Sequence, residues 1–367
     1  MPRHNLRRFA ALSSSAVIAA VSASLFSGIG SARHVAAASP PPFIDSDYVS
    51  QQASSNWQSW GCDQAEYSAS QHVSTTQLVL DFGTTYDQNG QYGTGLFHNA
   101  GFSQWDSRTT TGNRYIVALF LTGYWDCRST GWGVAPFINL IVGTNNEPSS
   151  GNNSTNAYWM GEVVLAVDTW IKGNGWGSLE NAIAGIDIED SWQGTGTESY
   201  SGTLSYLDAV LSEDGNIPTW NFGSLGGCDE TSYHASYNCG GTGWTQAEFL
   251  YLNWGYAPMW PLPEEYNSAS EKENNVWADP NSWEYYWIAK GSLQSGDGTM
   301  EFWASLTQYG ECSQYGGCNG TNNTAARGWS DLYAAITSDS ATSYGATCAL
   351  CMAWSDDISS LPGPGRT

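Results

Sequence analysis

Ile183-Ala-Gly-Ile-Asp-Ile-Glu-Asp-Ser-Trp192 begins as a short apolar run and then turns abruptly acidic. An uninterrupted apolar run of this length is typical of a strand that is buried on both faces of a sheet. Side chains alternate along a strand, so Asp187 and Glu189 point to one face while Ile186 and Ile188 point to the other. The stretch therefore predicts a buried strand whose carboxyl end carries two neighbouring acids.

The pair formed by Asp187 and Glu189 indicates acid–base chemistry. Two carboxylates about 7 Å apart on one face of a strand repel each other. Repulsion and partial burial both raise the pKa of one member of such a pair. One carboxyl group can then keep its proton near neutral pH while its neighbour stays ionised. A solvated acidic loop, or half of a cation site, is the alternative interpretation of an isolated Asp-x-Glu.

The composition is that of a folded chain with a large core. Of the 367 residues, 41% are hydrophobic and only 13% are charged, and the chain contains 19 Trp and 20 Tyr. An average soluble protein has about 25% charged residues. The length allows one large domain or two smaller ones.

The net charge of −23 limits the possible partners. It results from 12 Lys and Arg against 35 Asp and Glu, and no basic patch follows the first eight residues. Nucleic acid and anionic membranes both require such patches, so neither is an expected partner. A neutral carbohydrate polymer fits this charge better, although the charge is also compatible with a role in solubility alone.

Residues 1–38 are predicted to be a signal peptide. Arg3, Arg7 and Arg8 precede an apolar stretch that runs to Phe26, and residues 36–38 are three alanines that suit a cleavage site. Arg7-Arg8-Phe9 also resembles a twin-arginine signal. We therefore expect a secreted, extracellular protein.

The eight cysteines agree with export, because an even set in an oxidising compartment is expected to form disulfides. Cys348-Ala-Leu-Cys351 could be redox-active or bind zinc, but the chain has no second closely spaced pair that would complete a zinc site. A structural disulfide is therefore predicted there as well. The other predicted pairs are Cys62 with Cys127, Cys228 with Cys239, and Cys312 with Cys318.

Eight apolar runs are predicted to be strands, and most of them alternate with helical patterns. Residues 39–76 are predicted to form an irregular or part-helical lead-in, and residues 77–367 the main domain. The predicted helices are Tyr158–Ile171, Tyr200–Leu211, Trp277–Ala289 and Trp329–Ile336. The predicted strands are Leu78–Asp81, Tyr115–Leu121, Pro136–Val142, Ile183–Ile188, Ile217–Phe222, Phe249–Trp254, Met300–Leu306 and Thr347–Trp354.

Eight strand–helix units are the number that closes an α/β barrel of the (β/α)8, or TIM, type. Two connections fit this fold poorly. Residues 84–114 are rich in Gly and Thr and hardly helical, and the connection between the second and third predicted strands is short for a crossover. A doubly wound parallel sheet is the alternative fold.

In a (β/α)8 barrel the catalytic groups lie at the carboxyl ends of several strands. Glu189 is predicted to be the general acid, with Asp187 orienting it and Asp81 or Asp356 as the second carboxylate. Amides hydrogen-bond sugar hydroxyls, and aromatic rings stack on the apolar faces of sugars. The predicted substrate-binding residues are Asn146, Asn221, Asn253, Trp254, Tyr256, Gln308 and Trp354.

Other chemistries lack their usual motifs. The sequence contains no Gly-x-Ser-x-Gly of an ester hydrolase and no glycine-rich phosphate loop before a helix. His72, His98 and His234 are not spaced as zinc ligands. No cofactor or metal is therefore predicted, although a calcium site made of carboxylates stays open.

The acids at the ends of the first, fourth and eighth predicted strands resemble those of glycoside hydrolase family 25, the lysozyme-type muramidases. The matching residues are Leu80-Asp81, Asp187-Ile-Glu189 and Asp356. The resemblance implies that Glu189 is the acid and that the three aspartates complete the site. Leu78–Gly83, Ile141–Asn146 and Gly185–Trp192 together also resemble secreted bacterial barrel proteins of unassigned activity. The charge of −23 and the extra cysteines depart from the muramidase pattern.

Together, these features predict a secreted, monomeric glycoside hydrolase that cleaves a polysaccharide with either retention or inversion. The alternatives are a catalytically inactive barrel that binds glycan and an extracellular structural protein. The most informative test of the hydrolase hypothesis is whether Asp81, Asp187, Glu189 and Asp356 converge in one cleft.

Overall fold

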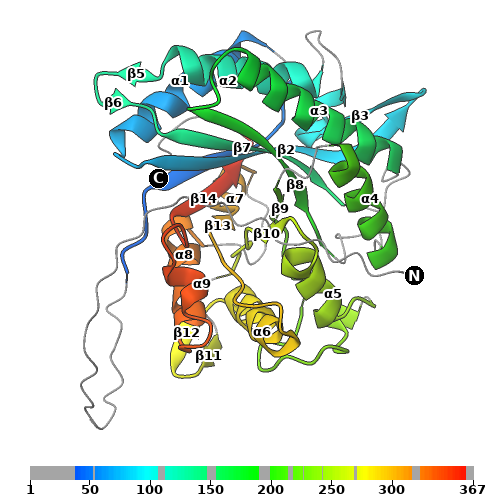
Figure 1. Cartoon of the computed structure of the whole chain (residues 1–367), viewed down its shortest axis with the longest axis vertical. Helices are drawn as coiled ribbons and strands as arrows, with labels where there is room; N and C mark the ends of the chain where they lie inside the picture. Colours follow the sequence, from blue (N-terminus) through cyan, green and yellow to red (C-terminus); the bar gives the residue numbers. More distant parts are fainter. Residues whose placement is uncertain are drawn as a thin grey trace, which may run out of the picture. The chain divides into compact units, whose positions relative to one another are not determined.

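A ring of eight parallel strands forms the centre of the computed structural model (Figure 1). The strands follow the order β10-β9-β8-β7-β2-β1-β14-β13, and backbone hydrogen bonds from Leu306 N to Pro263 O and from Glu265 N to Leu306 O, both 2.8 Å, join β13 to the segment after β10. The sheet is therefore closed, which confirms the predicted (β/α)8 barrel. The strands are β1 (Phe43–Tyr48), β2 (Thr75–Gln88), β7 (Phe137–Asn145), β8 (Glu180–Asp187), β9 (Thr219–Asn221), β10 (Met259–Pro261), β13 (Ala304–Thr307) and β14 (Trp354–Ser359).

The structure describes most of the chain from residue 38 to residue 360. The ranges are 38–52, 54–105, 112–146, 154–189, 199–213, 218–225, 227–241, 243–267, 271–315 and 323–360. The predicted signal peptide lies outside them except for residue 38. In the described ranges no helix is both long and apolar enough to cross a lipid bilayer.

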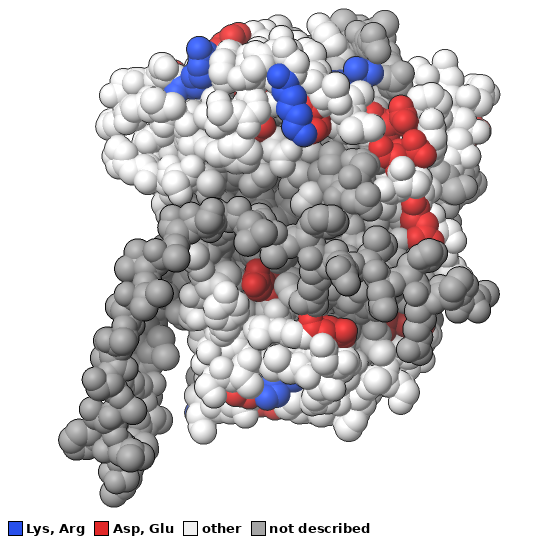
Figure 2. Space-filling model, in the orientation of Figure 1, with Lys and Arg blue, Asp and Glu red and all other residues white. Residues whose placement is uncertain are grey.

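Helices follow the strands and pack on the outside of the ring (Figure 1). Their apolar faces cover the barrel, as a sheet buried on both faces requires. The charged groups on the face drawn in Figure 2 are sparse, and only a few of them are Lys or Arg. The main helices are α1 (Ser55–Ser70), α2 (Asn113–Asp126), α3 (Ser154–Gly173), α4 (Tyr200–Glu213), α5 (Gln246–Leu250), α6 (Pro280–Ser295) and α8 (Ala325–Thr337).

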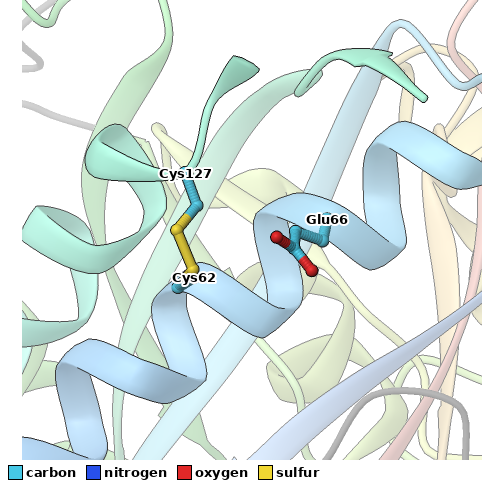
Figure 3. Close-up of side chains that lie close together, drawn as sticks. All are labelled: Cys62, Glu66 and Cys127. Atoms are coloured by element: carbon cyan, nitrogen blue, oxygen red, sulfur yellow. A yellow bond between two sulfur atoms is a disulfide. The ribbon is translucent and has the colours of Figure 1, made fainter. Parts of the chain in front are cut away.

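α1 and α2 pack backbone to backbone. A Cβ atom on Gly61 would overlap the Phe120 carbonyl oxygen, so only glycine allows this approach. A disulfide between Cys62 and Cys127 ties the two helices together, and Glu66 lies one turn further along α1 (Figure 3). Because both sulfur atoms are in the disulfide, these three residues offer no thiolate pair to a metal.

The described disulfides agree with the predicted pairs. Cys62–Cys127, Cys228–Cys239 and Cys348–Cys351 are all formed. Cys318 lies outside the described residues, so its predicted pairing with Cys312 is not described. Three disulfides are consistent with an oxidising, extracellular compartment.

Tryptophan rings fill the interior at the amino-terminal end of the barrel. The ring of Trp303 lies 5.1 Å from that of Trp260, 5.5 Å from Trp220 and 6.3 Å from Trp354. Trp354 is the first residue of β14, which locates this cluster at the end where the strands begin. The opposite, carboxyl-terminal end of the ring is left for polar groups.

β2 continues beyond the barrel. After an irregularity between Asp81 and Thr84, the strand pairs with β3 (Gln91–Leu96), which in turn pairs with β4 (Gly101–Gln104). This antiparallel extension explains why residues 84–114 show almost no helical pattern.

Two predicted strands are helical in the structure. Residues 115–121 belong to α2, and residues 249–254 belong to α5 and a π-helical turn, Tyr251–Gly255. A helix with apolar residues on most of its surface shows the same continuous apolar run as a buried strand. The weak crossover noted between the second and third predicted strands was the sign of this error.

Two real strands were missed. β1 lies in the predicted lead-in, residues 39–76, which forms β1 and α1 and so belongs to the barrel. Asp45, Ser46 and Asp47 interrupt the apolar run by which a buried strand is recognised. β10 lies between Pro258 and Pro263, and proline argues against a strand because it has no amide hydrogen to donate. In the eighth predicted strand only Trp354 is extended, since residues 344–347 form α9.

Candidate active site

Four acids gather at the carboxyl ends of the barrel strands. Asp81 lies within β2, and Asp187 is the last residue of β8. Glu189 lies two residues beyond β8, and Glu264 lies three residues beyond β10. Carboxylate oxygens of Asp187, Glu189 and Glu264 all lie within 4.8 Å of one another. Glu189 is partly exposed, whereas the other three side chains are buried. Glu189 therefore connects this acidic cluster to solvent.

Glu264 is a member of the cluster whose pKa is raised by its surroundings. Its side chain is only 1% exposed. Burial raises its pKa well above the usual range, and the negative charges of Asp187, Glu189 and Asp81 raise it further, while a hydrogen bond with Gln308 lowers it. The surroundings of Glu264 therefore favour the protonated form of its carboxyl group.

Asn146, at the end of β7, holds the backbone of Glu189 in place. Its side chain accepts from Glu189 N at 3.0 Å and donates to Glu189 O at 2.8 Å, while its own backbone N donates to Asp187 O at 3.1 Å. Ser224 Oγ donates to Glu189 Oε1 at 2.7 Å. A hydroxyl donor favours the ionised form of a carboxyl group. Glu189 is therefore held in position through both its backbone and its carboxyl group.

Asn221 and Asn253 lie behind the end of β8 instead of lining the cleft. Asn221 Oδ1 accepts from Ile188 N at 3.2 Å and Gly223 N at 3.0 Å, and its Nδ2 donates to Asn253 Oδ1 at 2.9 Å. Both side chains are fully buried. These two amides therefore support the strand end that leads to Glu189, and the structure buries both of them away from solvent.

We expect Asn221→Ala to lower the free energy of unfolding by about 2–3 kcal/mol, because it leaves buried donors and an acceptor without partners. Urea unfolding of the variant and the wild type measures this change. Asn174→Ala, at an exposed amide that bonds only the carbonyl of Trp170, is the control and should change stability much less. A substrate-contacting Asn221 would instead change KM and leave stability unaltered.

A glycine is required where β9 ends. A Cβ atom on Gly223 would lie 2.7 Å from Asp187 Oδ1 and closer still to the backbone of Ile188. Tyr285, from α6, donates its hydroxyl hydrogen to Gly223 O at 2.6 Å. This close approach brings β9 and its Asn221 amide against the acidic strand end.

Tyrosines and one amide border the cluster on its other side. Gln308 Nε2 donates to Tyr48 Oη at 2.5 Å and to Tyr266 Oη at 2.6 Å. Burial raises the pKa of Tyr48 well above its usual value, and the charges of Glu264, Asp187 and Asp81 add to this shift. The Tyr48 hydroxyl is therefore a neutral group among the acids. Gln308 lies in the mouth of the barrel, as predicted.

Asp81 is near the cluster and tightly held. Gly83 N donates to its Oδ1 at 2.8 Å. When the Asn145 amide is oriented with its nitrogen toward the carboxylate, it donates to Asp81 Oδ2 at 2.8 Å and to Oδ1 at 3.1 Å. The role of Asp81 is therefore electrostatic: its charge raises the pKa of Glu264 and of Tyr48, while its oxygens are engaged in hydrogen bonds.

Asp356 does not join the cluster. Its carboxylate accepts from Ser46 Oγ at 2.6 Å and Ser46 N at 3.1 Å, inside the barrel. Burial raises its pKa, and the neighbouring charges that contribute are Asp357 and Asp45. The sequence analysis expected the last strand to end at Trp354, but β14 begins there and runs to Ser359. Asp356 is consequently within the strand and not beyond its end.

Three predicted aromatic residues lie at the opposite end of the barrel. Trp354 starts β14 and donates from Nε1 to Thr75 O at the start of β2. Trp254 and Tyr256 precede β10, because the segment expected to be the sixth strand is helical. Trp254 Nε1 donates to Asp297 O at 3.2 Å, and the Tyr256 hydroxyl donates to Asp208. Among the predicted substrate-binding residues, Asn146 and Gln308 are the two at the mouth.

Sequence reasoning missed Glu264, Tyr48 and Ser224. The signal for Glu264 was the acidic pair that ends Pro261-Leu-Pro-Glu-Glu265, directly after a short apolar run. This signal was not recognised because the prolines in the segment argue against a strand.

The carboxylates of Asp187, Glu189 and Glu264 are also donors of the type that calcium prefers. A protonated Glu264 would have to release its proton before it could bind a cation. The other acid–cysteine group close enough to share an ion, Glu301 with Cys348 and Cys351, contains a formed disulfide.

Comparison with known proteins gives a weak structural likeness. No family model matches the chain, and no curated protein matches it. The chain is similar to the crystal structure of an endo-1,4-β-mannanase from Rhizomucor miehei, with 11% sequence identity and a TM-score of 0.40. The alignment covers 87% of this chain and 85% of the mannanase chain. None of these comparisons supports the lysozyme-type muramidases in particular.

Proposed function

We propose that the protein is a glycoside hydrolase that cleaves a neutral polysaccharide with retention of anomeric configuration. The observation that supports this proposal is the acidic cluster at the carboxyl end of the barrel. There, the buried and protonated Glu264 lies beside the partly exposed Glu189. Two carboxyl groups in different protonation states are the machinery that glycoside hydrolysis requires.

In the proposed reaction Glu189 is the nucleophile and Glu264 is the general acid. The Glu189 carboxylate attacks the anomeric carbon while Glu264 transfers its proton to the departing glycosidic oxygen. Glu264, now ionised, then removes a proton from water, which attacks the same carbon and releases Glu189. This assignment differs from the sequence-based one, in which Glu189 was the acid, because burial raises the pKa of Glu264 and Ser224 donates to Glu189.

Retention is proposed from the separation of the acids. Their nearest oxygens lie within 4.8 Å. Carboxyl groups about 5–5.5 Å apart characterise retaining enzymes, whereas inverting enzymes need about 6.5–9.5 Å to admit a water molecule between the general base and the substrate. The three acids leave no such space between them.

A neutral polymer is proposed because of charge. The chain carries −23, and an anionic substrate would be repelled by this excess of negative charge. The tyrosine and amide groups of Tyr48, Tyr266 and Gln308 are suited to sugar hydroxyls. Secretion after removal of residues 1–38 and a monomeric state belong to the same proposal.

The test is incubation of the purified protein with mannan, xylan, cellulose, chitin and peptidoglycan, the last because of the family 25 resemblance. We expect reducing ends from at least one glycan, and the first product should keep its anomeric configuration in proton NMR spectra. The Glu189→Gln/Glu264→Gln double variant controls for contaminating enzymes. Glycan binding without product would favour the non-catalytic barrel, and neither binding nor product would favour the structural protein.

A further inference from the structure

An exposed hairpin projects from the barrel at the end opposite the acids. β5 (Ser129–Thr130) and β6 (Gly133–Val134) connect α2 to the start of β7, which is the amino-terminal end of the ring. Trp132 is 66% exposed and Val134 is 71% exposed. Leaving two large apolar side chains in water gains nothing for folding. Their exposure therefore points to a function in binding.

The hairpin is held in one conformation. Thr130 Oγ1 accepts from Trp132 N at 3.0 Å, and Ala135 N donates to Arg128 O at 2.7 Å. The Arg128 guanidinium lies 4.0 Å from the centre of the Trp125 ring and donates to Trp125 O at 2.7 Å. Cys127, which directly precedes Arg128, is tied to α1 by the disulfide in Figure 3. Trp132 is therefore presented on a preorganised support, which lowers the entropic cost of binding.

Further aromatic rings continue from the base of the hairpin along the helices. Trp125 stacks on Trp176 at 5.1 Å, and Trp176 meets Trp170 edge to face at 4.8 Å. Trp170 also lines a groove of about 240 Å³ between α2 and α3, together with Arg114, Tyr115, Ala118 and Val167. We call Tyr115, Trp125, Trp132, Trp170 and Trp176 the aromatic strip.

We propose that the aromatic strip is a second binding surface for a neutral polysaccharide, separate from the acidic mouth. This inference rests on the proposed function for the identity of the polymer. Aromatic rings present apolar faces with a polar edge, which suits the faces of sugar rings, and a row of neighbouring rings suits a chain of repeating units. The charge of −23 disfavours a polyanion and an anionic membrane at this surface.

A remote surface of this kind would hold the protein on an insoluble polymer while the mouth stays open to another part of the chain. Two linked contacts raise the effective concentration of substrate at the active site. The strip should therefore affect retention on the polymer and not the turnover of short soluble substrates.

The experiment measures depletion of the protein from solution by insoluble mannan, cellulose and chitin at 4 °C. We expect Trp132→Ala and Trp170→Ala each to weaken retention by about tenfold, the size expected for loss of an aromatic anchor. Turnover of a soluble oligosaccharide should stay within about twofold of wild type. Trp277→Ala, at a tryptophan that is 59% exposed on β12 (Val276–Ala278), is the matched control and should be retained like wild type.

Retention that is unchanged in both strip variants overturns the inference, as does the absence of retention on every polymer. Sedimentation with phosphatidylcholine vesicles that is lost in Trp132→Ala, without retention on glycan, would assign the surface to a membrane and also overturns it. Trp132 lies on an exposed hairpin, so its variant separates binding from folding. Retention that depends on Trp132 with no oligosaccharide turnover would support the surface while contradicting the proposed hydrolase.

Discussion

Glu264→Gln is expected to lower kcat/KM for polysaccharide hydrolysis by about a thousandfold, since general acid catalysis contributes about 10²–10⁴. The amide keeps the size of the carboxylic acid but has no acidic proton for the leaving oxygen. The neighbouring Glu265→Gln is the control, because Glu265 receives a hydrogen bond from Ser282 and is affected by the charge of Asp279, away from the cluster. Its activity should stay within about twofold of wild type.

The substrate distinguishes the two acids. An aryl glycoside with a good leaving group needs little protonation, so Glu264→Gln should recover most of its kcat/KM on such a substrate, while its kcat stays low because the second step lacks its base. Glu189→Gln should not, because it lacks the nucleophile. Azide added to Glu189→Gly should attack in place of the missing carboxylate and form a glycosyl azide of inverted configuration. If Glu264→Gln hydrolysed polysaccharide like wild type, the proposed mechanism would be wrong.

The pH profile provides a second check on Glu264. Because burial and neighbouring charges raise its pKa, the acid loses its proton at a higher pH than an ordinary glutamic acid. Activity of the wild type should therefore fall on the alkaline side. This alkaline limb should be missing from the residual activity of Glu264→Gln.

The stability of the protein is expected to fall between about pH 4.5 and pH 8 because of Glu180. This residue begins β8 at the amino-terminal end of the barrel and is only 1% exposed. Burial raises its pKa to about 8, with a further increase from Asp126 and an opposing effect of Arg128. In this interval the folded protein holds a proton that the unfolded chain releases, so unfolding becomes easier as the pH rises.

The size of the effect follows from linkage. One pKa unit corresponds to about 1.4 kcal/mol, so the total loss is about 3–5 kcal/mol by pH 8. Glu180→Gln should remove this slope and raise the free energy of unfolding at pH 7 and above. Urea unfolding at pH 5, 6, 7 and 8 measures it, with Glu66→Gln at an exposed position of α1 as the control. Parallel curves for wild type and Glu180→Gln would contradict the buried, protonated carboxyl.

The barrel could be predicted because most of its strands show a recognisable apolar pattern in their own sequence. β7 and β8 are continuous apolar runs, and α3 and α4 have apolar residues at helical spacing. β1 and β10 could not be found in this way. In β1, polar residues face their neighbours across the ring, and β10 is enclosed by prolines, so both depend on pairing partners that are distant in the chain.

The site was predictable to the same extent. Asp187 and Glu189 were found because both follow one recognisable strand. Glu264 follows a strand without an apolar signal, and its protonated state comes from burial and from charges on other strands. Asp356 was misplaced because the last strand begins where it was expected to end, which leaves this acid inside the ring.

The proline-rich segment that carries Glu264 has one further consequence. Pro261 and Pro263 cannot donate backbone hydrogen bonds, and two such bonds, at Leu306 and Glu265, join this segment to β13 in the described chain. By contrast, β2 and β7 pair continuously from Thr75 to Asp81. The junction between β10 and β13 should therefore be the part of the barrel that opens most often by brief local unfolding. Amide hydrogens of Leu306 and Glu265 should exchange with deuterium sooner than those of β7, and such openings would give water and substrate a route to the acid that the closed ring buries.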